Sequence, residues 1–409
     1  MKRIVMLLLA LVSGLVMAQG TISIGLLLPF TGQYDWVGAN VQPVAQMIAD
    51  DANASGGIGG AQIRLLQGDT EGTVDAGFTA AQKLINADGV VALIGPTSLS
   101  LAGSQQLIVD AKVPMVSPTA GTTALDSFNT QYVFRTVPSD SLGGRAVARA
   151  ATDAQFLGRD SAFKKVVLMV ANAPAMVSFQ APIEKSMTDF GTPLLDSFQF
   201  TPDKPSYRTE VQQALALDPD LIVLVATPED SARVMQAAFQ AGYEGTWFVT
   251  QDQTTSDYIA LATPQLVDGI YGLEEVAAPE SAGLYDAFAA QLKAFDGKEP
   301  QIFGTNTYDA MNVVLLAMVR AARDGGEITR ATVAANIRPV TDAGEGKVVV
   351  HEYMAGKAAL LAGKEIDYQG LVGPIDFDAF GNITAPFAIK RVVDGAWQTV
   401  AIVPAAALE

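Results

Sequence analysis

Short apolar runs alternate along this chain with longer stretches in which apolar residues recur every three or four positions. The runs are rich in β-branched residues, as strands are, and the longer stretches have the spacing of one helix face. Runs such as 90–94 and 221–225 are apolar at every position, which is typical of parallel strands buried on both faces. The pattern predicts an α/β fold with strands at 22–28, 63–67, 90–94, 115–117, 166–170, 221–225 and 247–250.

Helices are expected between and after these strands. Thr73 is a favourable N-cap, and the apolar residues behind it predict a helix over 74–87. Its expected apolar face consists of Val74, Phe78, Ala81, Leu84 and Ile85. Ser139-Asp140 marks the start of another helix, and two more are expected at 281–295 and 306–323.

The series of strands and helices occurs twice along the chain. One series ends before about Thr136 and the next runs from Asp140 to about Thr250, while the tail after Gly370 becomes rich in turns. Asp394-Gly395, between apolar residues, predicts a hairpin in that tail. A chain of 409 residues is also two to three times the usual domain length, which favours two lobes.

The N-terminus has the features of a secretory signal peptide. Lys2 and Arg3 precede an apolar run over 4–16, and small residues place a cleavage site after Ala18. The run is shorter than the ~20 residues that span a bilayer, so we expect residues 1–18 to be removed on export. Because no cysteine follows the run, we expect no lipid attachment and an exported protein that is free in its compartment.

Composition excludes several classes of function. With 26 basic and 43 acidic residues the net charge is −17, which argues against nucleic acid or an anionic membrane as a partner. The chain has no cysteine and a single histidine, His351, so thiolate catalysis and a histidine-rich metal site are excluded. Since no common catalytic or nucleotide-binding motif occurs, we expect no catalytic residue, metal or cofactor, and a structural role for His351.

Two loops rich in hydroxyl groups follow apolar strands. Residues 94–100 lead from a strand into a helix, and residues 117–123 follow the next strand. Loops at the carboxyl ends of neighbouring parallel strands meet at the ligand crevice of an open α/β sheet. Hydroxyl and free N–H groups can hold a carboxylate there without a charged side chain, although helix capping alone also explains any one of these serines and threonines.

Several segments occur in an order that is more specific than any one of them. They are 24–32, 53–60, 94–96, 114–118, 133–140, 363–370 and 373–378. In this order they resemble the periplasmic substrate-binding proteins of ABC transporters for branched-chain amino acids and amides, the leucine/isoleucine/valine-binding type.

The resemblance implies a type I periplasmic binding fold, in which two doubly wound lobes with parallel-core sheets enclose a ligand cleft. A three-stranded hinge would join the lobes, with crossings near 135–136, 274–278 and 371–374. Lobe one would then comprise 21–136 and 278–370, and lobe two 137–277 and 371–409.

The resemblance also implies which residues bind the ligand. Two lobe-one loops hold the ligand carboxylate in this family, and here they supply Ser98, Ser100, Thr119, Ala120 and Thr122. The register stays open between Ser98 and Ser100, and between Gly121 and Thr122. Asp252, after a lobe-two strand, is the candidate for a charge-assisted contact with the ligand ammonium.

The part of the site that would face the ligand side chain departs from the family. Tyr34, Trp36 and Phe303 are candidates for this pocket, with ordinary packing as the alternative. Two tyrosines that are usual in the family are replaced by Ala175-Met176 and by Ala226-Thr227. These replacements leave room for a larger or differently shaped ligand.

The leading hypothesis is a periplasmic receptor, not an enzyme, that captures a branched-chain or other apolar amino acid and delivers it to a membrane ABC permease. We expect it to act as a monomer. The same fold binding a small amide or another carboxylate is one alternative, and a ligand sensor for a membrane receptor is a second. An exported hydrolase is the third, and a Ser-His-Asp mechanism would have to use His351.

Overall fold

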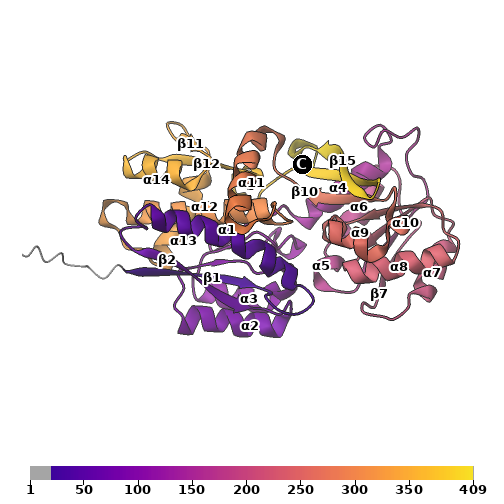
Figure 1. The fold of residues 1–409 in the computed structure, drawn as a ribbon, viewed down its shortest axis with the longest axis horizontal. Coiled ribbons are helices and arrows are strands. Elements are labelled where there is room, and N and C mark those ends of the chain that lie inside the picture. Colours follow the sequence, from indigo (N-terminus) through magenta and orange to yellow (C-terminus); the bar gives the residue numbers. More distant parts are fainter. Residues whose placement is uncertain (1–19, 409) are drawn as a thin grey trace, which may run out of the picture.

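The protein consists of two lobes that lie side by side along its long axis in this computed structural model (Figure 1). The structure describes residues 20–408, so the predicted signal peptide, residues 1–18, lies outside the described residues. None of the helices between residues 20 and 408 combines the length and the apolar character that a bilayer span requires.

Lobe one is built on a five-stranded parallel sheet with the order β2-β1-β3-β4-β5. Its strands are β1 (Thr21–Leu28), β2 (Gln62–Asp69), β3 (Ala92–Ile94), β4 (Met115–Ser117) and β5 (Val133–Arg135). Side chains alternate between the two faces of a strand, so Leu26 packs with α1 (Asp35–Ala54) and α12 (Gly304–Ala322). Leu27 packs with α2 (Val74–Gln82) and α3 (Ser98–Asp110) on the other face. Helices therefore cover both faces of this sheet.

A later stretch of the chain completes lobe one. It contributes α11 (Ala282–Asp296), α12, α13 (Arg330–Thr341), α14 (Tyr353–Leu361) and a three-stranded sheet of β11 (Val348–Val350), β12 (Ile366–Gly370) and β13 (Gly373–Pro374). α12 is the central helix, because every residue from Ala310 to Val319 is at most 2% exposed. Residues from two distant parts of the sequence thus share one core.

Lobe two contains a seven-stranded sheet with the order β15-β14-β10-β9-β8-β6-β7. Its strands are β6 (Val166–Ala171), β7 (Asp196–Phe200), β8 (Leu221–Val225), β9 (Thr246–Val249), β10 (Tyr271–Glu275), β14 (Phe387–Val393) and β15 (Ala396–Val403). The helices are α4 (Asp140–Thr152), α5 (Pro174–Val177), α6 (Gln180–Asp189), α7 (Arg208–Leu215), α8 (Pro228–Gln240), α9 (Ser256–Ala262) and α10 (Pro264–Val267). β6 to β10 pair in parallel, whereas β14 and β15 are antiparallel at one edge.

The predicted α/β class and the two lobes are confirmed. All seven predicted strands are present, with ends that differ by at most two residues. The tail hairpin is also present, and Asp394 and Gly395 both have positive φ, 53° and 75°, as a two-residue hairpin turn requires.

The predicted apolar face of the helix at 74–87 is partly wrong. Val74 and Phe78 are 41% and 45% exposed, although Ala81, Leu84 and Ile85 are buried as expected. The buried face of α2 uses small residues because α3 packs closely against it. A Cβ on Gly77 would lie only 2.7 Å from Cβ of Ser100 in α3.

The third crossing between the lobes lies later in the chain than 371–374. Buried residues from Leu371 through Ala385 belong to the apolar core of lobe one, and the core of lobe two resumes at Phe387. Phe377 accounts for part of this difference, because its ring packs 4.9 Å from that of Phe134 in β5. Its carbonyl also accepts a hydrogen bond from Arg338 Nη1 at 2.7 Å.

Candidate functional site

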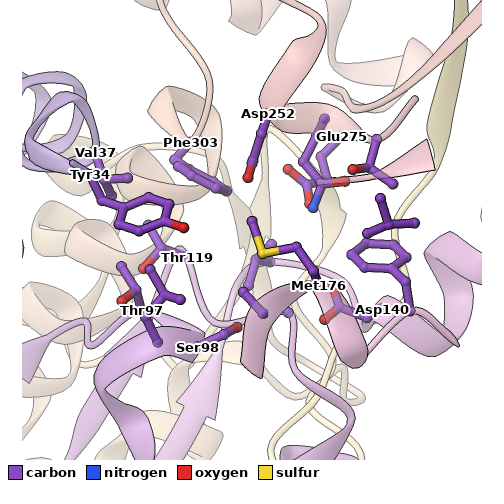
Figure 2. Close-up of a pocket in the computed structure, with 18 of the residues that line it drawn as sticks. Tyr34, Val37, Thr97, Ser98, Thr119, Asp140, Met176, Asp252, Glu275 and Phe303 are labelled. Atoms are coloured by element: carbon purple, nitrogen blue, oxygen red, sulfur yellow. The ribbon is translucent and has the colours of Figure 1, made fainter. Parts of the chain in front are cut away.

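A cavity lies between the two lobes at the carboxyl ends of their parallel strands (Figure 2). Lobe one lines it with Tyr34, Trp36, Val37, Thr97, Ser98, Leu99, Thr119, Gly121, Val137 and Phe303. Lobe two lines it with Asp140, Ala175, Met176, Phe179, Val225, Thr250, Gln251, Asp252 and Glu275. The two walls differ in chemistry, because the lobe-one wall is rich in hydroxyl and aromatic groups and the lobe-two wall carries carboxylates.

The lobe-one wall is centred on the N-terminus of α3. Thr97 is its N-cap residue and Ser98 its first residue. The N–H groups of a first helical turn have no acceptor inside the helix and carry partial positive charge. The Thr119 hydroxyl, which donates to the carbonyl of Pro96 at 3.3 Å, stands beside them. This wall therefore suits a carboxylate, although no lysine or arginine is present among the described residues that line the cavity.

Three residues predicted for this wall do not line the cavity. Ser100 is fully buried and faces α2, and its Oγ lies 3.3 Å from Oγ1 of Thr97. Ala120 is also fully buried, and its N–H donates to Ser117 Oγ at 2.9 Å. The Thr122 hydroxyl instead accepts a hydrogen bond from the amide of Ala124 at 3.3 Å.

Of the alternatives that the sequence leaves open for the two loops, Ser98 and Gly121 are the residues that lie at the cavity. Ser98 lines the cavity, and its Oγ accepts a hydrogen bond from the N–H of Thr122 at 3.2 Å. Gly121 also lines the cavity, and a Cβ there would lie 2.2 Å from Oδ1 of Asp140. A side chain at residue 121 would therefore collide with a lobe-two acid.

A buried arginine holds the second hydroxyl loop in place. Nη1 of Arg135 donates to the carbonyls of Gly121 at 2.8 Å and Thr122 at 3.0 Å, and Nη2 pairs with Asp126 at 2.6 Å. Asp126 in turn accepts hydrogen bonds from the hydroxyls of Ser139 and Ser141, both at 2.5 Å. The loop is thus fixed to the start of α4, across the first crossing between the lobes.

The three aromatic candidates all line the cavity. The Trp36 and Phe303 rings stack with centroids 6.1 Å apart and an interplanar angle of 11°. Burial and the neighbouring charge of Asp252 raise the pKa of Tyr34 above its usual value, so its hydroxyl stays protonated and able to donate. Figure 2 shows Tyr34 and Thr119 on one side of the cavity and Glu275 and Asp140 on the other.

Asp252 lies in the cavity lining, in the 3-10 turn Gln251–Gln253 after β9. Burial, and secondarily the charge of Glu229, raise the pKa of this partly buried side chain to about 6. No hydrogen bond or positive charge among the described residues acts in the opposite direction. The carboxylate form of Asp252 therefore lacks a partner within the described part of the protein.

Two further acids on the same wall were not predicted as site residues. Asp140 is the first residue of α4, and burial raises its pKa to about 7, against a hydrogen bond from Ser178 and the charge of Arg135. Glu275 ends β10, and burial together with the charges of Asp140 and Asp252 raises its pKa well above the usual value.

The sequence carried one signal for these two acids. Asp140 follows one predicted crossing between the lobes and Glu275 lies within another, and residues at a crossing can line an interlobe cleft. From the sequence, Asp140 is expected only at the start of a helix, and 274–278 only as a crossing.

Other observations limit the chemistry of the site. No three histidine, aspartate or glutamate side chains that the structure describes are arranged to hold a metal ion. His351 is exposed, lies outside the cavity lining, and places Nδ1 at 2.9 Å from the carbonyl oxygen of Gln369. The cavity thus combines anion-binding donors on one wall with acids on the other, an arrangement for holding a ligand of mixed charge.

Comparisons with known proteins agree with this architecture. The profile of the family described as periplasmic binding protein matches residues 21–396. The chemotactic signal transduction system substrate-binding protein BasB of Halobacterium salinarum is 26% identical over 92% of this chain and 88% of its own length.

Two solved structures share the fold. The leucine-binding protein LivK of Thermotoga maritima has a TM-score of 0.77 at 22% identity, covering 94% of this chain and 99% of its own. LivJ of Streptococcus pneumoniae, a branched-chain amino acid transporter substrate-binding protein solved with isoleucine, has a TM-score of 0.76 at 21% identity, with the same coverage. Together with the profile match over most of the sequence, these likenesses show that the chain belongs to the periplasmic binding protein family and has the type I fold of its leucine-binding members.

Proposed function

We propose that the protein captures an α-amino acid between its lobes and delivers it to a membrane ABC permease. The observation that carries this proposal is the opposition of the two cavity walls. The α3 N-terminus and the Ser98 hydroxyl offer donors to a carboxylate, and Asp252 on the facing lobe offers an acceptor to an ammonium group. A zwitterion satisfies both walls at once, and in doing so it draws the lobes together.

The remainder of the ligand would lie against Tyr34, Trp36 and Phe303. The resemblance predicts a branched-chain or other apolar side chain for that position, and aromatic rings offer a surface for one. We further propose that the protein works in the periplasm as a monomer and without catalysis. The relatives named above are substrate-binding proteins, which supports the last point.

A sensory role is the second candidate. It is favoured by the 26% identity, over nearly the whole chain, to a substrate-binding protein of a chemotactic system. The same closure would then present a closed shape to a membrane receptor instead of a permease. Capture of membrane partners with the ligand-loaded protein decides between them: co-purification of a permease supports transport, and co-purification of a chemoreceptor contradicts it.

Calorimetry tests the proposed ligand class. Protein that has been unfolded, freed of ligand and refolded is titrated with a panel of L-amino acids and small amides. We expect at least one amino acid to bind with a dissociation constant well below 1 mM. Failure of every amino acid in the panel to bind below 1 mM would contradict the proposal.

Asp252→Asn gives the corresponding mutational prediction. Truncating a partly desolvated acid that faces a ligand ammonium costs roughly 2–5 kcal/mol, so the dissociation constant for the bound amino acid should rise about 30- to 5000-fold. A neutral amide should lose far less. The matched control is Asp257→Asn, an exposed aspartate in the first turn of α9, which should leave affinity unchanged. Equal losses for amino acid and amide would show that Asp252 is not the ammonium partner.

A further inference from the structure

The cavity is lined by more acidic groups than the ammonium group of one zwitterion can pair with. Asp140, Asp252 and Glu275 all line it, and no lysine or arginine is present among the described residues of the lining. The charge of Asp252 raises the pKa of Asp140, and the charges of Asp140 and Asp252 raise the pKa of Glu275, as expected for acids that line one cavity. If the ligand carboxylate lies at the N-terminus of α3, a single α-ammonium group can pair with only part of the acidic wall.

Asp140 has a structural role that accounts for its position. It begins α4, where a negative charge is favoured by the helix dipole. The charge of Arg135 and a hydrogen bond from Ser178 also favour its carboxylate form. These interactions within the protein account for the position of Asp140 without a ligand.

Glu275 has no such explanation. Oε2 of Glu275 is inaccessible to solvent and has no hydrogen-bond partner among the described residues. The preceding residue on β10, Glu274, pairs with Lys390 of β14. No such cation pairs with Glu275 in the described structure. Every influence on the pKa of Glu275 raises it, which means that no group in the described structure favours its charged form.

A second unpaired acceptor lies in the same lining. Oε1 of Gln251, next to Asp252, is likewise inaccessible to solvent and without a donor. Buried acceptors without donors are rare in native proteins, because each one loses its hydrogen bonds to water. Two of them on one wall of a ligand cavity indicate a ligand that brings several N–H donors.

We propose that the bound amino acid carries a second cationic group, an amino or guanidino group at the end of its side chain, which pairs with Glu275 while the α-ammonium group pairs with Asp252. This inference rests on the proposed function, and it gives the bound amino acid a basic side chain in place of the apolar one that the resemblance predicts. The aliphatic stem of such a side chain can cover apolar residues of the lining such as Met176 and Phe179 while its charged end reaches the acid.

Two pairs of amino acids of matched shape test the inference by calorimetry on the refolded, ligand-free protein. L-lysine is compared with L-norleucine, which lacks the side-chain ammonium, and L-arginine with L-citrulline, which lacks the guanidinium charge. In at least one pair we expect the cationic member to bind roughly tenfold or more tightly, the effect of one charge-assisted hydrogen bond. Equal or tighter binding of the neutral member in both pairs would overturn the inference.

Glu275→Gln assigns the preference to a residue. We expect it to reduce the ratio of cationic to neutral affinity by about tenfold or more, since the amide cannot pair with a cation. Glu280→Gln, an exposed glutamate shortly after the same strand, is the control and should keep the ratio. A ratio that Glu275→Gln leaves intact would overturn the inference.

The outcomes also separate this inference from the proposed function. Binding of leucine or norleucine without binding of lysine or arginine would remove the inference and leave the amino acid receptor standing. If no amino acid binds, both this inference and the proposed function are contradicted.

Discussion

Asp309 in lobe one and Glu275 in the cavity are both carboxylates withdrawn from water, but their surroundings are opposite. Oδ1 of Asp309 accepts hydrogen bonds from the Tyr368 hydroxyl at 2.8 Å and the Leu371 amide at 2.9 Å, and its Oδ2 accepts one from the Val372 amide at 3.0 Å. Oε2 of Glu275 has no partner in the described structure.

This difference distinguishes a buried acid that stabilises the fold from a buried acid that is available to a ligand. Burial raises the pKa of Asp309 to about 7 even though its donors act to lower it. These donors join α12 to β12 and to the segment that follows it, so Asp309 connects two parts of lobe one. At Glu275 burial acts without opposition, and the cost of its charge is offset only when a cation enters the cavity.

The largest expected effect is on stability at Asp309. Asp309→Ala leaves three buried donors unpaired and should lower the free energy of unfolding by about 3–5 kcal/mol, measured by urea denaturation of ligand-free protein. Glu275→Gln removes an unpaired charge and should change it by less than about 1 kcal/mol, or raise it. If Asp309→Ala fails to fold, Asp309→Asn should show an intermediate loss. Similar losses for Asp309 and Glu275 variants would break the comparison.

The pH dependence of stability gives a somewhat smaller effect. A carboxyl whose pKa is raised on folding binds its proton more tightly in the folded state, so its contribution to stability is complete below about pH 4 and declines as the pH rises to the folded pKa. For Asp252 this decline covers about pH 4 to 6. The ligand-free Asp252→Asn variant should therefore become more stable than the native protein over this range, by on the order of 1–3 kcal/mol.

Urea denaturation at several pH values measures this difference. Asp257→Asn is again the control, because that aspartate is exposed. A stability difference between Asp252→Asn and the native protein that stays constant from pH 4 to 7 would contradict this prediction. It would show that the ionised Asp252 side chain does not destabilise the ligand-free protein.

The smallest expected effect concerns the uncharged wall. Ser98→Ala removes one neutral hydroxyl from the cavity and should weaken binding of the amino acid by about 0.5–1.5 kcal/mol, or roughly two- to tenfold. Calorimetry with Ser98→Ala and with Ser161→Ala, an exposed serine in lobe two, measures it. A loss as large as that of Asp252→Asn would contradict the view that the acidic wall contributes most of the discrimination.

Much of the architecture could be predicted because it depends on local pattern. Continuous apolar runs such as 221–225 are typical of a strand buried on both faces, and β8 is buried at every position. Asp394-Gly395 could be assigned to a hairpin because two adjacent residues with positive φ favour these residue types.

The site was less predictable because packing decides which side chains face it. Ser98 and Ser100 are two positions apart in α3, which rotates them by about 200° around the helix axis. Both are hydroxyl residues in one loop motif, so their order alone does not distinguish them. The close contact of Gly77 with Ser100 turns Ser100 toward α2 and leaves Ser98 at the cavity.

The sequence by itself determined the α/β class, the positions of the strands and a terminal hairpin, because each follows from periodicity or from the conformational preferences of a few adjacent residues. Only the tertiary structure decided that Asp140, Asp252 and Glu275, from three separate elements of lobe two, line one cavity opposite the N-terminus of α3. The three acids come together only through the packing of the whole lobe, because they are far apart in the sequence. No local stretch of the chain therefore indicates that they share one cavity.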